Sequence, residues 1–381
     1  MQWNTNLSLL LISKKTILLN ASFDRTFETV VCSGNLYRLA LLFLLFTALL
    51  IIATYYVLYK KKKNYQLNNK VRQQLGTLIT ELFVYENLAD IEIPDTLFAW
   101  LKHKDARQMV IDELTQNKSS FVGSMSENLK KLYRVLGLNI DSRIKLDDKR
   151  GYIQCQGIHE LCVMEQKDQY RKVFELTNSS NYDVRIEAQT AILKWYGFKG
   201  LRFLSVATYP ISEFQQLKML ELLRPLSFTS LENLDKWLIS PNDTVVNFAL
   251  KLAEHYNQQQ VKEEVAACLT HPNETVRIQA VKTLAVIGDE GTAGLLTMAY
   301  KNERFTNRLN ILRELPKVAG DEQRDFLIEQ LEAGHEYLKL AAAKVLAQCT
   351  SDGIEILEAK IADEPIPYHD IYLHVKSPAF K

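Results

Sequence analysis

A segment that recurs at a nearly constant interval constrains the fold of this chain more than any other feature of its sequence. Three copies align without gaps and share an asparagine, a valine three residues later and an alanine four residues after that: Asn181, Val184, Ala188, Asn242, Val245, Ala249, Asn273, Val276 and Ala280. With weaker copies, the first apolar residues of six repeats are Val184, Phe214, Val245, Val276, Phe305 and Leu338. A steady period of about 30 residues predicts a solenoid, in which each repeat packs on its neighbours.

Each repeat is expected to be a pair of helices. In the second helix, apolar residues four apart form a stripe on one face, with alanine at the closest approach to the next helix. Each asparagine stands three residues before the stripe, where its side-chain oxygen can accept from free backbone N–H groups at a helix start. Pro241 and Pro272 favour an end to the preceding helix. First helices are expected at Gln169–Asn178, Gly200–Ala207, Ser230–Ser240, Gln258–His271, Gly291–Lys301 and Asp321–Ala333, and Gly353–Ile361 is expected to cover the end of the stack.

These residues resemble the HEAT repeats. The resemblance lies in the pattern Asn-x-x-Val-Arg-x-x-Ala-x-x-x-Leu, which the copy at Asn273 carries best and the copy at Asn181 nearly as well, whereas the copy at Asn242 has Val246 in place of the arginine. The period is shorter than that of a typical HEAT unit, as in the compact HEAT-like repeats of phycobilisome lyases and many bacterial scaffold proteins.

The resemblance covers about residues 165–362 and implies an α-solenoid that binds other proteins. It also implies that Arg185 and Arg277 join a structural ladder between neighbouring repeats. Because one fold hosts many functions, it implies no substrate.

An uncharged apolar run precedes the repeats. It extends from Leu39 to Tyr59, and four consecutive lysines follow it: Lys60, Lys61, Lys62 and Lys63. A helix of this length reaches about 31 Å, the thickness of the hydrocarbon core of a bilayer. Since basic residues tend to stay in the cytoplasm, we expect a single-pass protein of the plasma (inner) membrane whose C-terminal part is cytoplasmic. The lysines are primarily a topological stop, and they are also placed to attract anionic lipid headgroups.

The remaining segments divide the chain as follows. We expect a short non-cytoplasmic tail at 1–38, the span at 39–59, a basic juxtamembrane stalk at 60–70, a helical subdomain at 71–164, about six repeats at 165–362 and a C-terminal tail at 363–381. The stretch Leu7–Ile12 is not read as a secretory signal, because its positive charge follows the apolar residues instead of preceding them. The subdomain contains helical spacing at 71–85, 93–102, 106–116 and 125–136, and a short helix is expected at 157–164. The C-terminal tail is expected to lie on the solenoid or a partner through Tyr368, Tyr372 and Phe380.

Composition argues against several classes of function. The formal net charge is +1, and beyond Lys63 acidic residues slightly outnumber basic ones, so no nucleic-acid partner is expected. Five cysteines without a CxxC pair indicate neither a disulfide framework nor a zinc knuckle. The sequence also lacks HExxH, GxGxxG, GxxxxGK[ST] and GxSxG, the minimal motifs of several enzyme classes.

Two enzyme-like alternatives remain open. His-Glu pairs occur at His159-Glu160 and His335-Glu336, and HEAT-like deoxyhypusine hydroxylases hold two irons with four such pairs. A bilin-lyase-like activity is the second alternative, suggested by the repeat length alone. Neither a metal nor another cofactor is expected.

The sequence therefore predicts an all-α, membrane-anchored scaffold or adaptor without catalytic residues. Its partner is expected to be another protein at or near the membrane. Candidate contacts are second-helix residues expected to be exposed: Lys251, Gln279, Lys282, Thr283 and Lys339.

Overall fold

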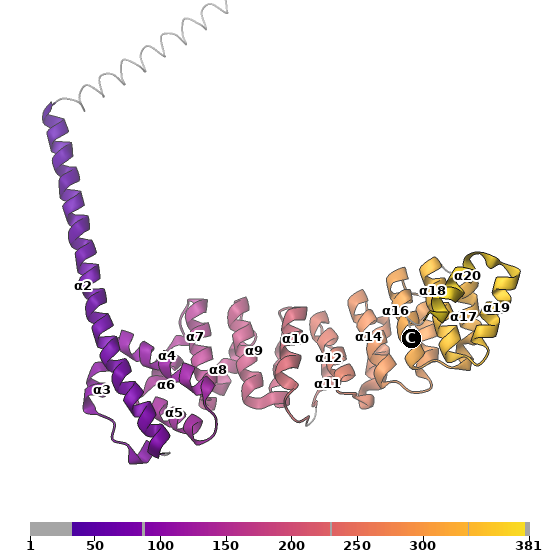
Figure 1. Ribbon diagram of the computed structural model, residues 1–381, viewed down its shortest axis with the longest axis horizontal. Coiled ribbons are helices and arrows are strands. Elements are labelled where there is room, and N and C mark those ends of the chain that lie inside the picture. Colours follow the sequence, from indigo (N-terminus) through magenta and orange to yellow (C-terminus); the bar gives the residue numbers. More distant parts are fainter. Residues whose placement is uncertain (1–32, 86–87, 229–230, 334, 378–381) are drawn as a thin grey trace, which may run out of the picture. The chain divides into compact units, whose positions relative to one another are not determined.

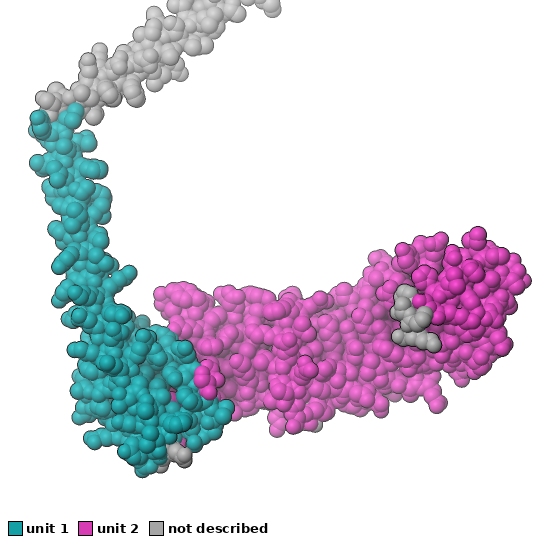
Figure 2. All heavy atoms as spheres, in the orientation of Figure 1, with its two compact units in different colours: residues 1–117, 121–128 teal, residues 118–120, 129–381 magenta. Residues whose placement is uncertain are grey.

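The computed structural model describes residues 33–85, 88–228, 231–333 and 335–377, and every regular element in these ranges is a helix (Figure 1). The chain divides into two compact units, shown in different colours in Figure 2. Unit 1 comprises residues 1–117 and 121–128, and unit 2 comprises residues 118–120 and 129–381. The boundary expected at residue 164 therefore lies inside unit 2. The all-α fold class is confirmed.

Unit 1 is organised by one 53-residue helix, α2 (Ser33–Tyr85). Three shorter helices follow: α3 (Asp95–Trp100), α4 (Lys104–Ser120) and α5 (Ser124–Val135), of which α4 and α5 end in unit 2. The expected span, stalk and first subdomain helix are thus a single uninterrupted helix. No proline separates the lysines from the apolar residues that follow, so no residue in this segment forces the helix to break.

The two halves of α2 differ in what surrounds them. Apolar residues of the second half are buried at helical spacing, namely Val71, Leu75, Leu78 and Leu82. Contacts inside unit 1 hold this half in place, including an ion pair of 2.6 Å between Arg72 Nε and Glu113 Oε1. In the first half, no residue of the apolar stretch is buried. Among the described residues, α2 is the one helix long and apolar enough to cross a bilayer.

Unit 2 is a row of helix pairs. The second helices of the pairs are α7 (Gly151–Val163), α9 (Tyr182–Tyr196), α10 (Glu213–Leu223), α12 (Asp243–His255), α14 (Glu274–Ile287), α16 (Phe305–Glu314), α18 (Glu336–Cys349) and α20 (Pro365–Lys376). The first helices are α6 (Leu138–Lys145), α8 (Tyr170–Leu176), the 3-10 helix η3 (Gly197–Val206), α11 (Leu234–Leu238), α13 (Lys262–Ala267), α15 (Thr292–Tyr300), α17 (Arg324–Ala333) and α19 (Gly353–Asp363). Successive second helices pack side by side from α12 to α20, as Figure 1 shows, so unit 2 is a solenoid.

The stripe of small and apolar residues lies where the sequence predicts it. Val184, Val245 and Val276 are fully buried, and so is the alanine four residues after each of them. At about 25 cal/mol per Å² of buried apolar area, one such valine contributes roughly 1.5–3 kcal/mol. Alanine at the contact lets neighbouring helices approach closely.

The expected frame is wrong in two repeats. Phe214 and Phe305 are 73% and 43% exposed, and the buried valine position is filled by Gln215 and Asn307, which are 3% and 1% exposed. Because the residue at the buried position is polar in these two repeats, the sequence pattern indicated the apolar residue one or two positions earlier. With the frame corrected, the buried positions from α12 to α18 are evenly spaced along the chain: Val245, Val276, Asn307 and Leu338.

The C-terminal tail is a further second helix. Tyr368 follows Leu338 by nearly the same interval and is buried, and its hydroxyl donates to the Leu331 carbonyl at 3.0 Å. Helix α20 packs against both α18 and α19, as α18 packs against α16 and α17. Of the other expected anchors, Tyr372 is half-buried and donates to Glu358, and Phe380 lies outside the described residues. The tail therefore completes the last pair and covers the end of the stack.

We predict that truncation after Asp363 destabilises the protein. The shortened chain loses burial of Tyr368 and Ile371, at about 1.5–3 kcal/mol for each large apolar side chain, and leaves one face of α18 uncovered. Truncation after Ser377 keeps α20 and serves as the control. Thermal unfolding followed by circular dichroism should give a lower Tm for the shorter variant alone. Equal Tm values would show that α20 does not belong to the solenoid core.

Candidate functional site on the second helices

The repeat asparagines cap their helices. Asn181 Oδ1 accepts from the backbone N–H of Asp183 and Val184, and the equivalent oxygens of Asn242 and Asn273 accept from the residue two positions later. The asparagine's own N–H donates to the side chain two residues before it: Ser179 Oγ, Ser240 Oγ and His271 Nδ1, respectively. This pairing was not predicted from the sequence, in which the position is serine in two copies and histidine in the third.

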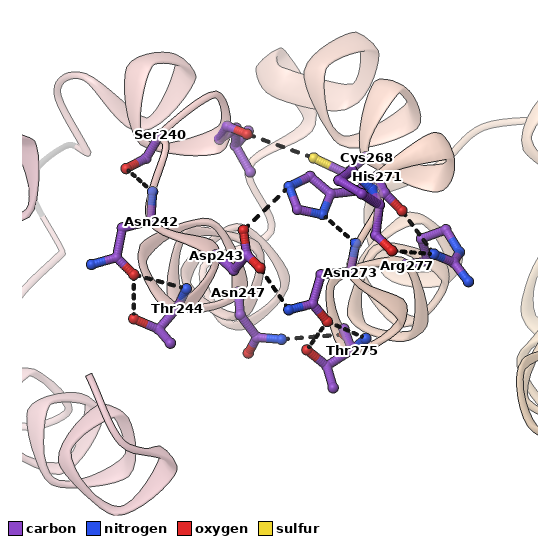
Figure 3. Close-up of polar contacts among 12 residues, drawn as sticks. Ser240, Asn242, Asp243, Thr244, Asn247, Cys268, His271, Asn273, Thr275 and Arg277 are labelled. Atoms are coloured by element: carbon purple, nitrogen blue, oxygen red, sulfur yellow. Dashed lines mark hydrogen bonds and ion pairs between the residues drawn. The ribbon is translucent and has the colours of Figure 1, made fainter. Parts of the chain in front are cut away.

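The asparagine amide groups also link neighbouring repeats (Figure 3). Asn273 Nδ2 donates to Asp243 Oδ2 at 2.7 Å, and Asp243 Oδ1 lies 3.8 Å from Nε2 of His271. Asn242 Nδ2 donates to the carbonyls of Ala207 and Tyr209, at 3.1 and 3.0 Å. These contacts join three successive repeats in what we call the inter-repeat ladder, and they use the polar atoms of its residues.

The repeat arginines belong to the same ladder. Arg277 donates to the carbonyls of His271 and Pro272, at 2.8 and 3.1 Å, and its Nε lies 2.6 Å from Glu303 Oε1. The Glu303 side chain is only 5% exposed, so this is a buried ion pair between repeats. The hydrogen bond to Glu303 also raises the pKa of Arg277 above its usual range.

Two more arginines make equivalent contacts. Arg185 donates to the Ser179 carbonyl at 2.6 Å and lies over the ring of Tyr209, 4.6 Å from its centroid. Arg308, which the sequence analysis did not single out, donates to the carbonyls of Tyr300 and Lys301. Its position one repeat after Arg277 could have identified it. Arg277 and Arg185 therefore contact the following repeat, whereas the hydrogen bonds of Arg308 lie within its own repeat.

Removal of Arg277 should be costly. We predict that Arg277→Ala lowers the free energy of unfolding by about 3 kcal/mol or more, because it leaves Glu303 buried without its partner. Arg304→Ala is the matched control, since Arg304 is 84% exposed and its contact with Glu274 is 3.9 Å long; a surface pair of this kind contributes less than about 1 kcal/mol. Urea denaturation measures both values. Similar losses in the two variants would contradict a structural role for the Arg277–Glu303 pair.

The expectation that Gln279 and Thr283 are exposed is wrong. They are 8% and 0% exposed. Thr283 Oγ1 donates to the Leu250 carbonyl at 3.1 Å, and Gln279 Nε2 donates to Glu254 at 2.6 Å, so both side chains connect α14 to α12. The physical reason is that an internal second helix packs on both neighbours and on its own first helix, which leaves only a narrow exposed face.

Lys339 also lies elsewhere than expected. It follows Arg308 by one repeat and so occupies the ladder position, where its Nζ lies 5.6 Å from the centroid of the Tyr368 ring. The residue equivalent to Lys282 in this repeat is Lys344. Lys339 therefore belongs to the packing of the last pair and not to the face that carries Lys282.

The exposed face of the second helices carries a basic row. Its members are Lys251, Lys282, Arg313 and Lys344, which follow one another at the repeat interval and are each partly or fully exposed. We call these four residues the basic row. Two members, Lys251 and Lys282, were expected contact residues. Arg313 was missed because the frame was displaced at Phe305, and in the repeat of Leu338 the residue expected was Lys339 instead of Lys344.

The His-Glu pairs do not come together. His159 Nδ1 lies 3.2 Å from Glu187 Oε1, which raises the pKa of the imidazole, while Glu160 is buried with Lys145 Nζ 2.5 Å from its Oε1. His335 precedes α18 and stacks on Tyr337. No group of three histidine, cysteine or acidic residues that could hold a metal ion occurs within the described parts of the chain.

The described cysteines are free thiols. Cys162 and Cys268 are buried, and burial raises the pKa of each to about 11. Cys155 and Cys349 are half-buried, and Cys32 lies outside the described residues. Because the thiolate is the reactive form, the two buried cysteines behave as small apolar side chains.

No protein-family model matches the sequence, and no curated protein matches it. Solved structures with a similar arrangement include an engineered protein (Northeast Structural Genomics Consortium target OR497), at 13% identity and a TM-score of 0.29 over 71% of this chain and 94% of that chain. The CpcE–CpcF complex of phycocyanin lyase from Nostoc sp. PCC7120 is 11% identical, with a TM-score of 0.24 over 75% of this chain and 96% of that one. The TOG-domain arrays of microtubule polymerases, in a structure on tubulin recruitment and assembly, are 11% identical, with a TM-score of 0.24 over 74% and 78%. The solenoid is accordingly established by its own helix packing.

Proposed function

We propose that this protein is a non-catalytic scaffold that is anchored in a membrane by α2 and holds a protein partner on its cytoplasmic helical repeats. The observation that carries the proposal is the exposed apolar half of α2. Phe43, Ile51 and Ile52 are each 68–69% exposed along a helix that has no covering element among the described residues. Exposing such a surface to water is unfavourable by roughly 25 cal/mol per Å², and a bilayer removes it from water.

The charge distribution supports the proposed orientation. Lys60–Lys63 follow the apolar run on α2, and basic residues beside a span favour its cytoplasmic end. The second half of the same helix belongs to unit 1, so the anchor and the core of unit 1 share one helix. The basic cluster is also placed to contact anionic lipid, at about 1 kcal/mol per residue near the surface.

Tethering supplies the mechanism. A solenoid exposes a long row of second helices that a partner can contact at several points, and the polar groups of the inter-repeat ladder are already used for stability. Confinement to the membrane raises the effective concentration of a membrane-bound partner, so weak contacts suffice for capture. Proteins of this architecture serve many functions, and the proposal accordingly rests on the anchor and the exposed face.

Crosslinking in intact cells tests the proposal. We predict that a specific membrane or membrane-proximal protein co-purifies with the full-length, C-terminally tagged chain after gentle solubilisation. The control is a fragment of residues 60–381, which lacks the apolar half of α2 but keeps the buried residues from Val71 to Leu82. The fragment should recover much less of the partner. Equal recovery with both forms would rule out tethering, and absence of any specific protein would contradict the scaffold function.

A further inference from the structure

The basic row lies on four consecutive second helices. Lys251 is on α12, Lys282 on α14, Arg313 on α16 and Lys344 on α18, and these helices pack side by side in the order of the chain. Neighbouring packed helices have axes about 8–10 Å apart, so the four side chains extend over roughly 24–30 Å. One positive charge per repeat at a constant position makes the row a regular surface.

Much of this positive charge is not neutralised within the protein. In the described parts of the chain, the side chains of Lys282 and Arg313 form no hydrogen bond or ion pair, whereas Lys344 interacts with another group of the protein. Of two carboxylates on these helices, Glu314 pairs with Lys317 at 2.6 Å, whereas Glu254 accepts from the neutral Gln279 amide and keeps its negative charge. Lys251 Nζ donates to the Gln216 side chain at 2.9 Å, and because this side chain is neutral, the contact does not neutralise the charge of Lys251.

An apolar groove lies beside two members of the row, Arg313 and Lys344. Between α16 and α18 lies a pocket of about 210 Å³ whose walls include Leu309, Leu312, Tyr337 and Leu340, with Arg313 and Lys344 at the same site. The apolar positions also follow the repeat, since Ile278, Leu309 and Leu340 occupy equivalent places in successive repeats. The pocket is smaller than the roughly 300–1,000 Å³ of small-molecule sites, and it suits an inserted apolar side chain.

We propose that the basic row and the adjacent apolar positions bind an acidic amphipathic helix of a protein partner, laid across α12, α14, α16 and α18. This inference rests on the proposed scaffold function and names the chemistry of its partner. Two turns of an α-helix advance about 11 Å, close to the spacing of the second helices, so a carboxylate at every seventh residue meets one cation per repeat. Apolar residues three and four positions later would then face the groove, as in other helix-in-groove complexes.

A peptide-binding experiment tests this inference on the full-length protein in phosphatidylcholine nanodiscs. The probe is a fluorescent helical peptide of roughly 22 residues, with glutamate at every seventh position and leucine three and four residues after each. A second peptide carries lysine in place of each glutamate. We expect the acidic peptide to bind, at least tenfold weaker binding to the Lys282→Glu, Arg313→Glu variant, and weakening by salt. We expect no binding of the basic peptide to the native protein.

A matched control separates local from general electrostatics. Lys199→Glu, Arg202→Glu makes the same change in net charge at exposed residues of η3, on the first-helix side. It should leave peptide affinity within about twofold, and circular dichroism should show that both variants remain folded. Equal affinity of the native protein and the Lys282→Glu, Arg313→Glu variant, or equal binding of acidic and basic peptides, would overturn the inference.

Vesicle binding and crosslinking in cells distinguish a lipid contact, or a partner bound elsewhere, from the proposed helix. If the Lys282→Glu, Arg313→Glu variant loses binding to phosphatidylserine-containing vesicles but keeps the acidic peptide, the row contacts lipid and the inference fails. If a partner crosslinked in cells is recovered equally by the native protein and this variant, the groove assignment fails while the scaffold function stands. Absence of a partner with the native protein counts against the scaffold function itself, whatever the peptide result.

Discussion

The packing of each second helix between its two neighbours is the interaction on which this structure depends. Val245, Val276 and the alanines that follow them are completely buried, so the stack forms by repetition of one contact. The same geometry fixes the position of every other feature. Polar residues near the helix starts, such as Asn273, Asp243 and Arg277, form the inter-repeat ladder, and only a narrow face of each internal second helix remains exposed.

The residue type at this packing contact determines which features of the fold could be predicted from the sequence. Where the buried position is apolar, the period, the caps and the helix pairs were all predictable. Where it is Gln215 or Asn307, the frame predicted from the sequence was wrong, and the equivalence of Arg313 to Lys282 was therefore not predicted. Exposure could not be read from helical periodicity alone, because Thr283 faces a neighbouring helix that no single-helix pattern reveals.

The C-terminal tail and the apolar run near the N-terminus could also be predicted only in part. The tail at 363–381 looked unlike a repeat because Pro365 and Pro367 interrupt its pattern, yet Tyr368 occupies the buried position of a second helix. At the other end, the apolar run was clear from its length and lack of charge, whereas its continuation into the core of unit 1 required the structure. The apolar run and the buried residues Val71 to Leu82 of unit 1 therefore lie on one continuous helix.

The most direct test of the account is site-specific photocrosslinking in living cells, with a photoreactive amino acid introduced into the full-length protein. Leu340 lies in the groove between α16 and α18, and Leu295, on the first helix α15, is 37% exposed and serves as the comparison position. The account predicts a discrete adduct with a membrane or membrane-proximal protein from Leu340 and none from Leu295. An adduct from Leu295 alone would contradict the assignment of the second-helix face as the surface that binds the partner.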